Sequence, residues 1–250
     1  MKNPPQKTPQ SSLDVDILGM SWTQFKRHMA ENWELGQHFF ICAPTGSGKT
    51  TFMVKLSEVR RRVLAFDLKA GDKTLMASGW DRITKFPLPY GERDKLNNDP
   101  TFRRIIGDLN KSPKARQISV TVMEKYFDWI IENGNFTVII PDLAIFAAKY
   151  FGDMWNKIIY GLLTLRDNNV SLVLDAQMTS RIPPEAKSQA SFIAIAYTLS
   201  NDEITEYASM MGIKPTILRG AVKAMKNYPF SWLIVSRNPR DPMIMTRPEV

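Results

Sequence analysis

Residues Ala43–Thr51 read A-P-T-G-S-G-K-T-T, and this stretch decides the fold. An apolar run, His38–Cys42, precedes it, and a helix-compatible run, 50–59, follows it. A strand, a glycine-containing loop and a helix in this order are the context of a phosphate-binding loop. The first motif position holds Ala43, and a small residue there also allows the tight turn. The alternative is a chance Gly/Ser/Thr loop, against which both the pattern and its flanks argue.

The residue types in this loop fit a nucleotide triphosphate with magnesium. Gly46 and Gly48 lack a Cβ, so the backbone can turn successive N–H groups toward an anion. We expect Lys49 to reach the β- and γ-phosphates and the Thr50 hydroxyl to complete a Mg²⁺ shell. The predicted ATP-binding residues are Ala43, Pro44, Thr45, Gly46, Ser47, Gly48, Lys49, Thr50 and Thr51.

Length and composition favour one ordinary α/β domain. The chain has 250 residues, of which 44% are hydrophobic, and no apolar stretch approaches the ~20 residues of a membrane span. We expect a soluble, intracellular protein with a disordered, proline-rich tail at 1–13. Residues 14–250 are predicted to form a single domain with a C-terminal strand or hairpin extension. The single cysteine, Cys42, excludes an intrachain disulfide and is expected to be a buried thiol.

The remaining chain alternates between strand and helix patterns. This alternation predicts an α/β fold with a mostly parallel sheet and helices on both faces. The predicted strands cover 61–67, 136–140, 170–174, 192–199 and 230–236, with a short one at 243–246. The predicted helices cover 22–34, 101–109, 120–132, 150–166, 202–211 and 216–225.

A nucleotide site also needs an acid at the end of a neighbouring strand. Asp142 follows the predicted strand 136–140 and is the candidate for holding Mg²⁺ or orienting the attacking water. The usual tandem acid is absent, because Pro141 and Leu143 flank it. Asp67 and Asp175 end other strands and are alternatives for the missing charge, with a capping role equally open for each.

Two further segments, with the loop and Asp142, resemble the FtsK/HerA superfamily of DNA-pumping ATPases. Residues 170–190 are similar to that superfamily's strand-glutamine segment, with Gln177 in the sensor position. Residues 67–72 (D-L-K-A-G-D) are similar to its Asp-x-Lys-Gly segment. The resemblance covers about residues 36–212 and implies a RecA-like P-loop NTPase core, a hexameric ring and ATP at subunit boundaries. Ala176 departs from the family's usual threonine.

The same resemblance implies an arginine that acts across the subunit boundary. Arg166, before the glutamine strand, matches that location, and Arg181 is the alternative. If Asp142 is the catalytic acid, Asp67 becomes the metal-side acid.

A compact chain of this kind resembles the genome-packaging ATPases of membrane-containing, double-jelly-roll viruses. It would pump double-stranded DNA in the host cytoplasm, next to capsid or portal-vertex proteins. A plasmid or conjugation-type pump and a non-motor ATP-dependent switch remain alternatives. A small-molecule kinase is disfavoured by the Gln177 segment.

Net charge adds support for a polyanionic partner. The formal charge is +8, which suits phosphate contacts but also an ordinary basic surface. Two basic segments, 101–116 and 214–247, are candidates for contacting DNA. The first contains Arg103, Arg104, Lys111, Lys114 and Arg116, and the second contains Lys214, Arg219, Lys223, Lys226, Arg237, Arg240 and Arg247.

Overall fold

The computed structural model describes residues 17–141, 143, 152–175, 184–197 and 200–249. Within them a single sheet has the order β1-β10-β9-β8-β2-β7-β6-β3-β5-β4. Its strands are β1 Ile17–Gly19, β2 His38–Cys42, β3 Arg62–Phe66, β4 Asp81–Ile83, β5 Phe102–Ile106, β6 Thr137–Ile140, β7 Ser171–Asp175, β8 Ala190–Ala196, β9 Trp232–Ser236 and β10 Met243–Thr246. The tail at 1–13 lies outside the described residues.

The sheet is parallel from β8 to β4, and β9 is antiparallel to both its neighbours. The strands of the parallel part therefore end at one edge, which we call the carboxyl edge. The opposite edge, where these strands begin, is called the amino edge. The predicted α/β fold with a mostly parallel sheet is confirmed.

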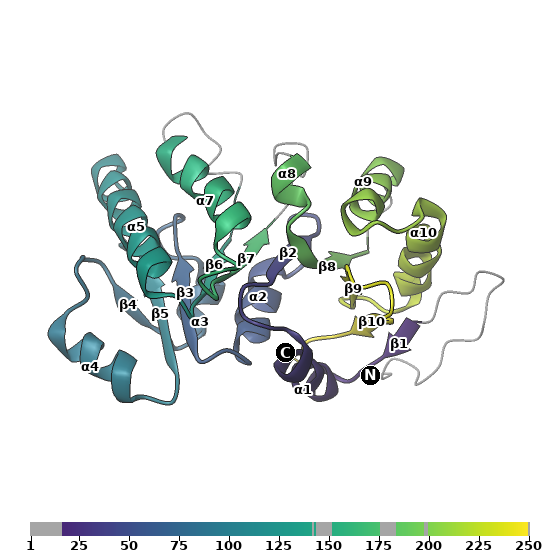
Figure 1. Ribbon diagram of the computed structural model, residues 1–250, viewed down its shortest axis with the longest axis horizontal. Helices are drawn as coiled ribbons and strands as arrows, with labels where there is room; N and C mark the ends of the chain where they lie inside the picture. The colour runs from purple at the N-terminus through teal and green to yellow at the C-terminus, as the bar shows by residue number, and fades with distance from the viewer. Residues whose placement is uncertain (1–16, 142, 144–151, 176–183, 198–199, 250) are drawn as a thin grey trace.

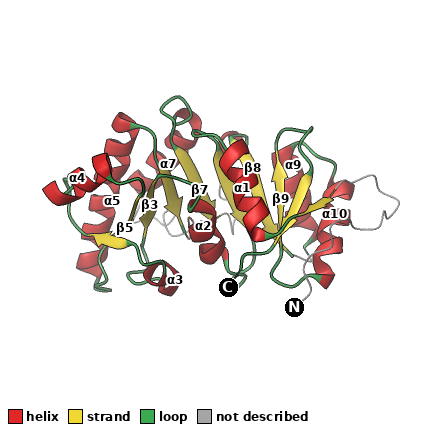
Figure 2. Ribbon diagram, turned by 90° about the horizontal axis from the view of Figure 1, so that it is seen from below, coloured by secondary structure: helices red, strands yellow, loops and turns green. Residues whose placement is uncertain are grey.

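Helices cover both faces of this sheet (Figure 1). The described helices are α1 Trp22–Asn32, α2 Lys49–Ser57, α3 Lys73–Ala77, α4 Tyr90–Asn98, α5 Pro113–Asn133, α7 Gly152–Thr164, α8 Pro184–Lys187, α9 Asn201–Met211 and α10 Pro215–Ala224, with the 3-10 turn η3 Met225–Asn227. Helices α1 and α2 cross one face, as Figure 2 shows, and α5, α7, α9 and α10 cover the other.

Two hydrophobic clusters, one on each face, explain why the strands read as continuous apolar runs. Phe40 and Leu174 belong to the cluster beneath α5, α7 and α9, whereas Phe39 and Val173 belong to the cluster beneath α1 and α2. Successive residues of one strand point to opposite faces. Both faces are covered, so both sets of side chains are apolar.

The predicted helix at 101–109 is wrong, because this segment forms strand β5 between β3 and β4. Phe102, Ile105 and Ile106 are buried on a two-sided strand, and the arginines between them are held by other elements. The sequence F-R-R-I-I lacks helical spacing, and its pairing with β3 is a tertiary contact that local pattern does not report. The other predicted helices and strands are present with shifted ends.

Candidate nucleotide-binding site

The loop between β2 and α2 has the backbone that its glycines predict. Gly46 and Gly48 have φ values of 82° and 84°, in the left-handed region that favours glycine. A Cβ built on either residue would meet no atom within 4 Å. Open space therefore lies above both glycines, and the first turn of α2 directs unpaired N–H groups toward that loop.

Lys49 is buried within this loop rather than extended into solvent. Its Nζ donates hydrogen bonds to the carbonyl oxygens of Ala43 (2.9 Å) and Pro44 (2.8 Å). It also lies 3.9 Å from Oδ2 of Asp175, and both side chains are less than one-tenth exposed. The ammonium is thus oriented by the loop and by the end of β7.

Two residues, Ser47 in the loop and Thr50 in the first turn of α2, add hydroxyl groups to this region. Ser47 Oγ is buried and has no hydrogen-bond partner among the described residues. A buried hydroxyl without a partner raises the free energy of the folded state unless a ligand or water forms a hydrogen bond with it. Thr50 is half-buried in the first turn of α2. The donor set of Thr50 and Asp175 fits Mg²⁺, which takes few protein oxygens together with phosphate and water oxygens.

The strand order explains why Asp175 reaches the lysine. β7 lies between β2 and β6, and Asp175 is in register with Ile41, just before the loop. From the sequence alone, Asp175 is one of several acids at the end of a predicted strand. Its position beside the loop follows from the pairing of β7 with β2, which the sequence pattern does not report. β6, which leads into Asp142, is one strand further away.

Three of the predicted site residues, Asp142, Gln177 and Arg181, lie outside the described residues. The described strands β6 and β7 end at Ile140 and Asp175, on the same edge as the loop. The chain therefore enters both segments at the carboxyl edge.

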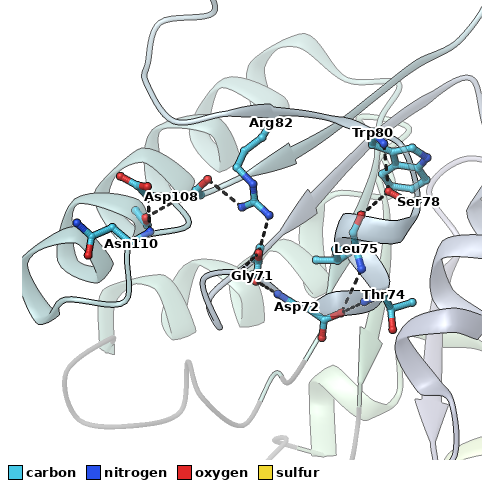
Figure 3. A network of polar contacts seen from close by, with 12 residues as sticks. Gly71, Asp72, Thr74, Leu75, Ser78, Trp80, Arg82, Asp108 and Asn110 are labelled. Carbon is cyan, nitrogen blue, oxygen red and sulfur yellow. Dashed lines mark hydrogen bonds and ion pairs between the residues drawn. The ribbon is translucent and has the colours of Figure 1, made fainter.

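Asp67, the alternative metal-side acid, is engaged within its own loop. Its Oδ2 accepts hydrogen bonds from Arg82 Nη2 (2.8 Å) and from the Gly71 amide (2.9 Å), and its Oδ1 accepts one from the Asp72 amide (3.4 Å). Figure 3 shows Arg82 pointing to this turn, with Asp72 capping α3 through Thr74 and Leu75. Sequence reasoning missed Arg82. These contacts shape the 67–72 loop and occupy the carboxylate.

Arg166 lies at the amino edge, in the turn between α7 and β7. Its Nη2 donates to Ser191 Oγ at 3.3 Å. A five-residue strand such as β2 spans about 16 Å, so Arg166 and the loop of the same chain are at opposite edges of the sheet.

The two basic segments differ in the structure. In the first, Arg103 donates to the carbonyls of Glu58 and Arg60, and Arg104 pairs with Glu92. The pKa of Arg103 is lowered, and burial of its guanidinium is the main cause. The guanidinium groups of both arginines are hydrogen-bonded to other elements of the chain, which corrects their inclusion in a DNA-binding candidate.

In the second segment, the exposed face of α10 and of the turn after it is basic. Leu218, Ala221 and Val222 are buried. The exposed cations are Lys214, Arg219, Lys223 and Lys226. No Asp or Glu occurs between 214 and 240, so this stretch of the chain has no acidic residue of its own.

Within the described residues, no helix is long and apolar enough to cross a membrane. The same part of the chain holds no group of three or more His, Cys, Asp or Glu side chains arranged for a metal. Cys42 is a free, buried thiol whose pKa is raised by burial above all.

Comparison with known proteins decides the fold. No protein-family model matches the chain, and no curated protein matches it. The DNA-packaging ATPase B204 from Sulfolobus turreted icosahedral virus superposes with a TM-score of 0.55 and 16% identity, over 87% of this chain and 100% of that one. This chain has the fold of that packaging ATPase.

Two other solved structures are similar to the chain. VirB4 of Thermoanaerobacter pseudethanolicus gives a TM-score of 0.56 at 8% identity, over 85% of this chain and 89% of that one. The pCW3 conjugation coupling protein TcpA, solved with ATPγS, gives 0.51 at 12% identity, over 84% of this chain and 60% of that one. The expected resemblance to viral packaging and FtsK/HerA-type ATPases is confirmed at the level of the fold, with a RecA-like α/β core.

Proposed function

We propose that the chain is an ATPase that binds ATP with Mg²⁺ at the loop 43–51. The observation that carries this proposal is the open glycine loop at the carboxyl edge, with Lys49 buried between the loop carbonyls and Asp175. Its structural relatives include a protein described as a DNA-packaging ATPase.

Each residue of the site has a role in this proposal. The loop amides and Lys49 hold the phosphates, and Ser47 Oγ gains a partner in a phosphate oxygen. Thr50 with Asp175 or Asp142 would hold Mg²⁺, which neutralises charge on the β- and γ-phosphates when bound. Asp142 and Gln177, which lie outside the described residues, orient the attacking water.

Hydrolysis joins a water oxygen to the γ-phosphorus and breaks its bond to the β–γ bridging oxygen. The products are ADP, inorganic phosphate and a proton. Because there is little covalent chemistry for the protein to perform, positioning and charge stabilisation supply the rate.

We further propose that hydrolysis drives double-stranded DNA through a homo-oligomeric, hexameric ring. The exposed cations of α10 are suited to sequence-independent phosphate contacts, because the stretch 214–240 that carries them has no acidic residue. Packaging of a viral genome in the host cytoplasm, beside capsid or portal-vertex proteins, is the biological setting we favour.

ATP hydrolysis with and without duplex DNA, across a salt series, tests this function. We expect DNA to stimulate hydrolysis at low salt and the stimulation to fade as salt rises. Lys49→Ala should abolish hydrolysis while the variant remains folded at the assay temperature. DNA-stimulated turnover at the wild-type rate in that variant would refute the site.

A non-motor switch is the second candidate, favoured by one feature of the chain. Buried Pro141 directly follows β6 where a tandem acid is usual, so this strand end supplies one acid instead of two. A switch predicts very slow hydrolysis that ignores DNA. A conjugation-type pump, in contrast, predicts the same DNA stimulation as a packaging motor but no capsid partner.

A further inference from the structure

Phe230 is an exposed aromatic residue in the turn that leads from η3 into β9. The residue is 69% exposed, so its ring gains little from packing. Its φ is 63°, in the left-handed region that a bulky side chain rarely adopts. Neither burial nor backbone preference therefore accounts for a phenylalanine at this position. Strained residues of this kind are concentrated at ligand-binding and active sites.

Arg247 lies beside this ring, just after the end of β10. Its Cζ is 5.7 Å from the centroid of the Phe230 ring. Within the described part of the chain its guanidinium makes no hydrogen bond or ion pair, so its N–H donors are unused. An exposed ring next to unused donors matches the two needs of a purine base, which are a flat surface for stacking and hydrogen bonds to its ring nitrogens.

The strand register places this pair at the carboxyl edge, in line with the nucleotide loop. Cys42, the last residue of β2, pairs with Ile195 of β8. The next residue of β8, Ala196, pairs with Trp232 at the start of β9. The start of the loop and the entry to β9 are therefore two strand spacings apart, about 10 Å. This separation is within the length of one nucleotide.

Helix α2 connects the two places. The ring of Phe52 in this helix is 4.6 Å from the ring of Trp232, centroid to centroid. Lys55 Nζ donates a hydrogen bond to the carbonyl oxygen of Glu249, two residues after Arg247. The entry to β9 and the segment after β10 thus both flank the helix whose first turn closes the nucleotide loop.

The contact between Lys49 and Asp175 indicates which way a nucleotide would extend from this loop. Asp175 ends β7, which lies on one side of β2, whereas β8 and β9 lie on the other. In the proposed site the terminal phosphates lie toward Lys49 and Asp175. The sugar and base then extend in the opposite direction, over the ends of β8 and β9, where Phe230 is exposed.

We propose that Phe230 and Arg247 bind the adenine base of the ATP whose phosphates are held by the loop 43–51. Phe230 stacks on a face of the purine, and Arg247 donates hydrogen bonds to its ring nitrogens. The inference rests on the proposed ATPase function and adds a base-binding part to its site. A purine has a larger stacking surface than a pyrimidine, so ATP should bind more tightly than UTP.

Separate affinities for a nucleotide and for its phosphates alone test this contact. The probes are AMPPNP, a non-hydrolysable ATP analogue, and inorganic tripolyphosphate, which lacks the base, each titrated with Mg²⁺ into the full chain by calorimetry. Phe230→Ala should weaken AMPPNP binding by about 10-fold or more and leave tripolyphosphate binding unchanged. Arg247→Ala should weaken AMPPNP binding with the same selectivity. Tyr90→Ala, which removes an exposed aromatic residue at the opposite end of the sheet, is the matched control and should change neither affinity.

Two more variants separate loss of the ring from damage to the fold. Phe230→Gly removes the ring and suits the left-handed backbone, so it should remain folded and lose the same affinity as Phe230→Ala. Phe230→Trp keeps a flat ring and should retain affinity for AMPPNP. An AMPPNP affinity in Phe230→Ala and Phe230→Gly equal to that of the wild type overturns the proposal. Equal weakening of both probes also overturns it, because the defect would then lie in the phosphate loop.

The results distinguish this inference from the proposed function. If the wild type binds both probes and Lys49→Ala weakens both, unchanged AMPPNP binding in the Phe230 variants refutes the base contact alone. If the wild type binds neither probe, the proposed function and the inference fall together. Phe230 variants that bind AMPPNP normally but lose affinity for duplex DNA would assign this ring to DNA, which overturns the base assignment.

Discussion

At the scale of single residues, Asp175 places a carboxylate beside the loop lysine at the end of a buried strand. Asp175→Asn keeps the shape and removes the charge that orients Lys49. We expect ATP hydrolysis to fall by about 10- to 100-fold, with a higher Mg²⁺ concentration needed for half-maximal rate. A Mg²⁺ titration of steady-state hydrolysis measures both. Asp202→Asn, an exposed change on α9, is the control, and an unchanged Mg²⁺ profile in Asp175→Asn would contradict the assigned role.

Asp67 and Arg82 form a second residue-scale test, of stability instead of turnover. Both side chains are largely buried, and the ion pair is 2.8 Å long. Arg82→Met leaves the Asp67 charge with amide donors only, and we expect the free energy of unfolding to fall by about 3 kcal/mol. Denaturant unfolding measures it. Glu58→Gln breaks the exposed Lys26–Glu58 pair and should change stability by less than about 1 kcal/mol; equal losses in both variants would refute the argument.

At the scale of elements, His38 joins β2 to β7 and makes this contact sensitive to pH. Its Nδ1 accepts a hydrogen bond from the Leu172 amide at 3.1 Å. Burial, and then Arg166, lower the pKa of His38 from 6.5 to about 4. The unfolded chain therefore binds a proton below pH 6.5 that the folded chain does not, so stability is complete above that pH and falls as the pH decreases toward 4.

Between pH 6.5 and 5 this histidine should cost about 2 kcal/mol of unfolding free energy. Chemical denaturation at several pH values measures the slope. His38→Asn keeps an acceptor and removes the titration, so its slope should be flatter than that of the wild type. His28→Asn controls for the other histidine. Identical slopes in His38→Asn and the wild type would show that the bond to Leu172 is not the source.

The same elements show which features can be predicted from sequence. The strand, loop and helix at 38–57 were predictable because glycine positions and apolar runs are local signals. Strand β5 was not, since Arg103 and Arg104 make it look polar until their partners on other elements are known. The contact between Lys49 and Asp175 depends on β7 lying next to β2, a matter of strand order that spacing along the chain does not encode.

At the scale of the whole molecule, the exposed cations of α10 and of the turn after it lie at one end of the sheet. Helix α10 lies on the side of β8, β9 and β10, away from β4 and β5 (Figure 1). Its exposed cations face solvent, whereas the two arginines of β5 are hydrogen-bonded to groups on other elements. Of these two elements, α10 is therefore the better candidate for contacting a DNA duplex, a choice that net charge alone does not make.

Removing three of these cations tests that assignment for the molecule as a whole. The triple variant Arg219→Ala, Lys223→Ala, Lys226→Ala should weaken binding to duplex DNA of any sequence. If all three contact phosphates, the slope of log affinity against log salt should become shallower by about 2–3, because fewer counterions are released. Fluorescence anisotropy with two unrelated duplexes measures it. The matched variant Lys114→Ala, Arg116→Ala, Lys125→Ala removes the same charge from α5. A loss that depends on position supports a DNA surface on α10; equal losses in both variants would mean that only net charge attracts DNA.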